Sequence, residues 1–105
     1  MIQKGGTMNP KLKTESVENL FDAILTLETK EDCYRFFEDV CTIKELLAMA
    51  QRYEVAMLLD QKMTYLDIAA KTGASTATIS RVNRSLTYGE DGYEEVFKRL
   101  KINGR

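Results

Sequence analysis

Histidine is absent from this 105-residue chain, and proline occurs only once. Without histidine, neither a Cys/His zinc site nor a His-based catalytic set is available. There are only six glycines, and no β-branched stretch alternates with polar residues over the length of a strand. We therefore predict an all-α fold. No glycine-rich phosphate loop or paired acid–base constellation is visible either, so we expect no enzyme, no metal and no cofactor.

Cysteine and long apolar runs are also scarce. Cys33 and Cys41 are eight residues apart on apolar positions. One helix would hold them too far apart for a disulfide, so both are expected as small buried hydrophobes. We find no signal peptide and no apolar run long enough to span a bilayer, so we expect a cytoplasmic chain with no membrane partner.

Positive charge is limited overall but locally concentrated. The net charge is −1, which by itself argues against a nucleic-acid partner. Between Lys11 and Asp60, eleven acids outnumber six bases, whereas between Thr64 and Tyr88 three bases face only Asp67. The positive charge is thus local to one segment. Because three cations are few, non-specific binding to nucleic acid should be weak and strongly salt-sensitive.

Apolar periodicity predicts helices on both sides of this segment. The expected ranges are 14–27, 29–41, 42–60 and 93–100, and we predict a single domain over 14–105 after a flexible arm at 1–13. A capping box at Thr42-Ile-Lys-Glu45 begins the longest helix, and apolar residues run almost all round it. A helix that is apolar on most faces must be buried on most faces, so in so short a chain we expect a homodimer.

The segment 64–86 predicts two short helices joined by a tight turn at Gly73. Thr64 and Ser75 stand at the helix starts, where a hydroxyl accepts a hydrogen bond from an otherwise orphan backbone N–H group. Glycine enters the left-handed conformation of such a turn without a steric penalty. Ile79 is placed to fill the angle between the helices. This is the sequence form of a DNA-binding helix-turn-helix.

The outer face of the second helix carries small or polar side chains flanked by cations. The residues predicted to face bases are Ser75, Thr76, Ala77 and Ser80. Those predicted to contact mainly phosphates are Lys71, Arg81 and Arg84. Two helices around a glycine turn also occur in helical proteins that never bind DNA. A helical interaction module that kept this shape without DNA binding is therefore the alternative.

From Cys41 to about Leu100 the chain resembles the Trp repressor family, most closely its YerC/YecD-like branch. The blocks that carry the resemblance are T-I-K-E-L-L-A-M-A-Q-R and G-A-S-T-A-T-I-S-R. The resemblance implies a six-helix fold and an intertwined homodimer. It also implies a corepressor pocket for L-tryptophan in which Arg52 and Arg81 flank the indole. The other matching pocket residues are Thr42 and Ser85.

One residue departs from the pattern of the tryptophan-binding relative. Glycine follows the second pocket arginine there, whereas this chain has Val82. Overfilling a closely packed site typically costs about 1–3 kcal/mol, roughly ten- to a hundredfold in affinity. We therefore disfavour L-tryptophan as the effector. Arg52 and Arg81 would then make helix-dipole, acidic-side-chain or phosphate contacts, and whether another small molecule acts stays open.

Taken together, these features predict a sequence-specific transcriptional regulator, expected to be a repressor. It would bind double-stranded DNA as a homodimer on a pseudo-palindromic operator. The helical interaction module is the second reading, supported by the acidic first half of the chain. Binding to random duplex at low salt separates the two, because an interaction module should show no salt-dependent binding.

Overall fold

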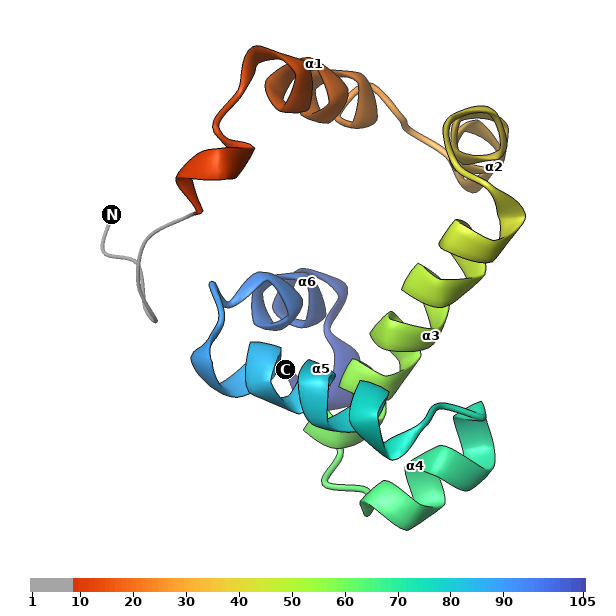
Figure 1. Cartoon of the computed structure of the whole chain (residues 1–105), viewed down its shortest axis with the longest axis vertical. Helices are drawn as coiled ribbons and strands as arrows, with labels where there is room; N and C mark the ends of the chain where they lie inside the picture. The colour runs from red at the N-terminus through yellow and green to blue at the C-terminus, as the bar shows by residue number, and fades with distance from the viewer. Residues whose placement is uncertain (1–8) are drawn as a thin grey trace. The chain divides into compact units, whose positions relative to one another are not determined.

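The computed structural model describes residues 9–105, which form six α-helices, two short 3-10 helices and no strand (Figure 1). The elements are η1 (Pro10–Leu12), α1 (Glu15–Ile24), α2 (Lys30–Val40), α3 (Ile43–Asp60), α4 (Tyr65–Thr72), α5 (Thr76–Tyr88), α6 (Gly92–Leu100) and η2 (Ile102–Gly104). The predicted all-α fold is confirmed. Of the expected arm at 1–13, residues 1–8 lie outside the described residues, and η1 forms a single turn at 10–12.

Hydroxyl side chains fix the starts of four helices. Thr14, Thr29, Thr64 and Ser75 each accept a hydrogen bond from the backbone N–H three residues later. Before α3, Glu45 and Thr42 exchange the two hydrogen bonds of a capping box, at 2.9 and 3.1 Å. The Thr42 N–H that donates to the Glu45 carboxylate holds the pKa of Glu45 below its ordinary value.

The described chain divides into two compact units, one up to Leu46 and one from Leu47 to Arg105. The first unit holds α1 and α2, and neither helix has a buried residue. Leu25, at the end of α1, is 81% exposed. The apolar stripes of these helices are therefore not covered within the chain. The expected single domain over 14–105 stays a prediction.

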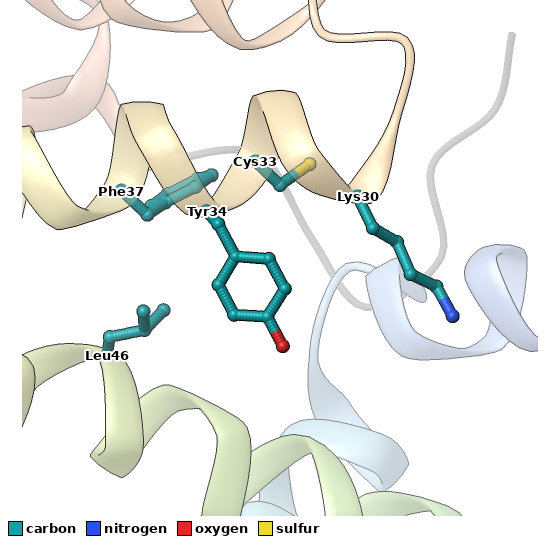
Figure 2. A pocket seen from close by; sticks show the side chains of 5 residues that line it. All are labelled: Lys30, Cys33, Tyr34, Phe37 and Leu46. Carbon is teal, nitrogen blue, oxygen red and sulfur yellow. The ribbon is translucent and has the colours of Figure 1, made fainter.

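An apolar groove of about 250 Å³ runs along α2 in this first unit. Its lining comes from one face of α2 and from the first turns of α3: Lys30, Cys33, Tyr34, Phe37 and Leu46. Figure 2 shows the α2 side chains on the side of the helix that faces Leu46. Both cysteines are free thiols, as expected, but Cys33 is exposed and Cys41 is only half-buried within the chain, whereas we expected both to be buried.

The second unit contains the hydrophobic core. Its buried residues come from α3, α4, α5, α6 and the turn of the α4–α5 pair: Val55, Ala56, Leu58, Ile68, Ala74, Ile79, Val82 and Phe97. Tyr53 and Tyr93 pack their rings against Phe97, which joins α3 to α6. The first half of α3 lies outside this core, because Ile43 is 78% exposed and Leu47 64%.

The link from α3 to α4 is a tight C-cap built around Lys62. Lys62 has a φ of 69°, the left-handed conformation that usually requires glycine. Its N–H donates to the carbonyl of Leu59 at 2.9 Å, and the N–H of Met63 donates to that of Leu58 at 3.1 Å. This pair of bonds is the Schellman pattern, which satisfies the last carbonyls of α3 and redirects the chain within two residues.

Candidate nucleic-acid interface

Two short helices, α4 and α5, are joined by the turn at residues 73–75 (Figure 1). Gly73 has a φ of 75°, and its N–H donates to the carbonyl of Ala69 at 2.9 Å. Ser75 then caps α5 by accepting the N–H of Thr78 at 3.1 Å. The left-handed glycine ends one helix and the serine begins the next, so the chain reverses over three residues.

Apolar side chains hold the inner faces of α4 and α5 together. Ile68 of α4 and Ile79 of α5 are both fully buried, and Ala74 lies between them in the turn. Val82, one turn further along α5, is 2% exposed in the same core. The angle between the two helices is therefore fixed by packing, as the position of Ile79 in the sequence predicts.

The turn is also held by hydrogen bonds from Thr72. Its hydroxyl donates to the carbonyl of Ile68 at 2.7 Å and accepts the N–H of Ala74 at 3.1 Å. The side chain of Gln51 on α3 donates to the carbonyl of Thr72 at 3.3 Å. The sequence analysis did not predict this contact, because Gln51 and Thr72 are 21 residues apart and no local pattern connects them.

The opposite face of α5 is open to solvent. Its exposed residues include Thr76, Ala77, Ser80, Arg81 and Arg84, and Lys71 is exposed near the end of α4. Ser75 is exposed as well, but its hydroxyl is already bonded to the backbone N–H and the hydroxyl of Thr78. Within residues 9–105, none of the three cations is ion-paired with a carboxylate. Their charge is therefore available to a ligand.

A cavity of about 280 Å³ lies at the second half of α5. Its lining consists of Arg81, Arg84, Ser85, Tyr88 and Gly89. A side chain in place of Gly89 would collide with the carbonyl oxygen of Ser85, which accepts the N–H of Gly89 at 3.0 Å. Tyr88 and Gly89 were not predicted as site residues. The only available signal was the helix break after Leu86, and α5 in fact continues to Tyr88.

The residues that the family resemblance matches to a corepressor pocket lie in different parts of the structure. Arg81 and Ser85 share the cavity at α5, and among the described residues neither Arg52 nor Val82 lines it. Arg52 is exposed on α3, and Val82 lies in the core. Thr42 belongs to the other unit, where it caps α3. The pocket as a set stays a prediction.

No group of three or more Cys, Asp or Glu side chains within residues 9–105 is arranged to hold a metal ion. No helix among the described residues has both the length and the apolar character needed to cross a membrane.

Comparison with known proteins gives several strong similarities. The family model described as Trp repressor protein matches residues 15–101. The uncharacterised protein YerC of Bacillus subtilis is 53% identical over 91 residues, which cover 87% of this chain and 88% of YerC. The match to the family model includes the helix-turn-helix and every buried core residue.

Two solved structures have the same fold. A TrpR-like protein from Eubacterium eligens is 66% identical with a TM-score of 0.87, over 89% of this chain and 96% of that one. A proposed Trp repressor from Staphylococcus aureus is 46% identical with a TM-score of 0.89, over 95% of this chain and 100% of that one. Both similarities extend over almost all of the described elements.

Proposed function

The chain belongs to the Trp repressor family, in its YerC-like branch, and from that premise we propose that it is a sequence-specific DNA-binding regulator of transcription, acting as a repressor. One observation carries the proposal. On the inner face of α5, Ile79 and Val82 are buried, while the outer face presents short polar side chains and cations that form no ion pair within residues 9–105. A helix supported in this way is rigid enough to be laid into a major groove.

The α5 side chains divide by the chemistry of their contacts. The short side chains of Thr76, Ala77 and Ser80 suit close approach to base edges. Arg81 and Arg84, with Lys71 from α4, suit the phosphates on either side. Ser75 has its hydroxyl occupied by the α5 cap, so its contribution is to the orientation of the first turn rather than to a base. This narrows the base-facing set expected from the sequence.

The regulator acts as a homodimer in this proposal. Neither α1 nor α2 has a buried residue, and the groove along α2 is lined mainly by apolar side chains. Contiguous apolar surface of this kind marks an interface, and a second copy of the chain is the occupant we infer. Two-fold symmetry would present two α5 helices to half-sites about 34–36 Å apart, on a pseudo-palindromic operator.

L-Tryptophan is not the effector in this proposal. The Val82 side chain is part of the core that sets the α4–α5 angle, so that angle is maintained without a ligand. Because no tryptophan is bound in this proposal, Arg81 is available to contact a DNA phosphate.

Replacing Arg84 with alanine tests the DNA-binding proposal. Binding to a random duplex, measured by fluorescence anisotropy across a salt series, should be weaker for Arg84→Ala. The slope of log K against log salt should be flatter by about 1.8, because the homodimer loses two phosphate contacts at about 0.9 each. Arg99→Ala is the matched control. Arg99 is an exposed α6 arginine whose nearest carboxylate oxygen, on Glu95, is 3.9 Å away. Its slope should equal that of the wild type.

Two outcomes would contradict the proposal. If the wild-type dimer shows no salt-dependent binding to duplex, the alternative of a helical interaction module replaces it. If Arg84→Ala and Arg99→Ala behave alike, DNA does not bind through the exposed face of α5.

A further inference from the structure

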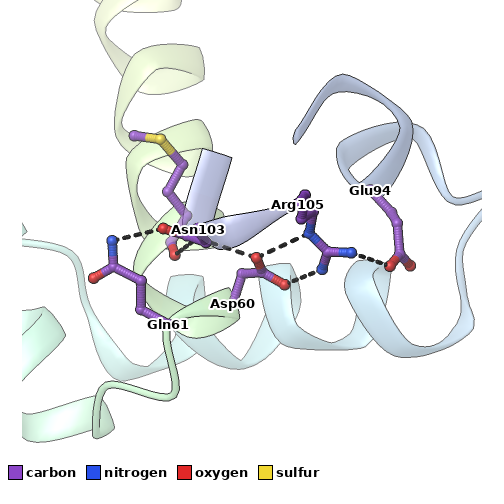
Figure 3. Close-up of polar contacts among 6 residues, drawn as sticks. Asp60, Gln61, Glu94, Asn103 and Arg105 are labelled. Carbon is purple, nitrogen blue, oxygen red and sulfur yellow. Dashed lines mark hydrogen bonds and ion pairs between the residues drawn. The ribbon is translucent and has the colours of Figure 1, made fainter. Parts of the chain in front are cut away.

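Residues 103–105 fold back onto the end of α3 (Figure 3). The side-chain amide of Asn103 donates to the backbone carbonyl of Met57 and to the carboxylate of Asp60, both at 3.0 Å. The same side chain accepts the Nε2 hydrogen of Gln61 at 2.8 Å through its Oδ1. One asparagine therefore contacts three residues of the last turn of α3 and its cap.

Arg105 joins the same turn to α6. Its guanidinium donates to both carboxylate oxygens of Asp60, from Nη2 and from Nε at 3.3 Å. A third donor, Nη1, bonds Glu94 of α6 at 2.7 Å. Arg105 thus bridges two carboxylates on different helices, as Figure 3 shows. Bidentate arginine–carboxylate pairs fix geometry as well as charge.

This network is more enclosed than the other ion pairs among residues 9–105. The side chains of Arg105 and Asp60 are 27% and 16% exposed, whereas each side chain in the other pairs outside the network is more than half exposed. The hydrogen bonds from Arg105 hold the pKa of Asp60 below its ordinary value. The carboxylate is therefore charged throughout the neutral range, and Lys62 adds a further attraction.

The network lies at the end of α3, directly before the link that leads to α4. Asp60 and Gln61 precede the left-handed Lys62, and α4 begins at Tyr65. A change in the backbone of the last turn of α3 would be transmitted through these few residues to the direction of α4. Gln51 holds the opposite end of α4 through the carbonyl of Thr72. Both ends of the first helix of the helix-turn-helix are therefore anchored.

We propose that Asp60, Asn103 and Arg105 form a clamp whose function is to position the helix-turn-helix for DNA. They are positioning residues, because their hydrogen bonds connect residues 103–105 to the last turn of α3 and to α6. This inference rests on the proposed DNA-binding function. It distinguishes Arg105 from Arg84, whose guanidinium is unpaired within the described residues and available to phosphate.

The variants Arg105→Gln and Asn103→Ala test the clamp in two steps. In the unbound protein, amide hydrogen exchange at Gln61, Lys62 and Met63 should be about five- to tenfold faster in both variants. Exchange at Ile79, inside the core, should change little. Arg99→Gln is the control, because it removes an arginine of the same charge whose nearest carboxylate is on its own helix.

The second step is DNA binding by the same proteins. Both clamp variants should bind duplex about three- to tenfold more weakly, with the salt slope of the wild type retained because no phosphate contact is lost. Arg105→Lys keeps the charge but not the bidentate geometry, so its affinity should fall between wild type and Arg105→Gln.

Three results would overturn the clamp. Unchanged exchange at residues 61–63 would show that the network does not hold the end of α3. Faster exchange with unchanged DNA affinity would limit it to a structural role. A flatter salt slope for Arg105→Gln would make Arg105 a phosphate contact. If the wild type itself binds no duplex, the proposed function fails, and the exchange experiment still decides whether the clamp exists.

Discussion

Val82 contributes to the core, at a position where the resemblance described above implies glycine in a tryptophan-binding relative. Its side chain is 2% exposed and packs with the residues that join α4 to α5. A glycine there would remove this packing and leave space beside α5. In this chain valine provides that packing, so side chains of the core hold α4 and α5 at their angle.

Shortening the Val82 side chain should lower the stability of the folded protein. Val82→Ala removes two buried methyl groups, and we expect the free energy of unfolding to fall by about 2 kcal/mol in urea titrations. Ser85→Ala, at an exposed position of the same helix, should change it by less than about 0.5 kcal/mol. L-Tryptophan should leave the duplex affinity of the wild type unchanged. Tighter binding with tryptophan would contradict the role given to Val82.

The roles of some residues could be predicted from the sequence, and those of others could not. Gly73 and Ile79 were predicted because their roles depend on neighbours within a few positions. Arg105 was not, because its partner Asp60 is 45 residues away and no spacing rule connects them. Asn103 was not predicted as a site residue either. Its contacts with α3 depend on tertiary packing, which no local pattern encodes.

The helix starts could be predicted closely because each depends on a hydroxyl residue and the three residues after it. Thr14, Thr29, Thr64 and Ser75 all precede the first helical residue directly. Helix ends were harder to place. α5 continues two residues beyond Leu86 before its cap at Gly89, and the link after α3 uses a left-handed lysine. Lysine carries no turn signal, so this conformation was not predictable.

Ser75 allows capping and DNA contact to be separated at the start of α5. Ser75→Ala removes the cap and should lower the free energy of unfolding by about 1 kcal/mol. Ser75→Asp keeps a good cap and complements the helix dipole, so stability should be close to that of the wild type. Its negative charge would face phosphates, however, and duplex affinity should fall by at least about tenfold.

These outcomes are checked by urea unfolding and by anisotropy on the same samples. Duplex affinity that is unaffected by Ser75→Asp would place the start of α5 away from DNA. A loss of stability in Ser75→Asp equal to that of Ser75→Ala would contradict the capping role.

At the scale of the whole molecule, many large apolar side chains among residues 9–105 are not covered within the chain. α1, α2 and the first half of α3 contribute large exposed side chains, including Phe21, Val40 and Ile43. Apolar periodicity predicted these helices, and the apolar residues around most of the range 42–60 led us to expect a homodimer. Intersubunit packing cannot be read from one sequence, because the stripes look the same whether they are buried within a chain or between chains.

In-vitro selection of duplexes bound by the wild-type protein tests the central proposal most directly. A homodimer with two α5 helices should enrich a pseudo-palindromic sequence whose half-sites are centred about one helical turn apart, 10–10.5 base pairs. Arg84→Ala should lower the yield of bound duplex without changing the sequence that is enriched. Failure to enrich any sequence, or half-sites at a spacing that is not a multiple of one turn, would contradict the proposed dimer bound through α5.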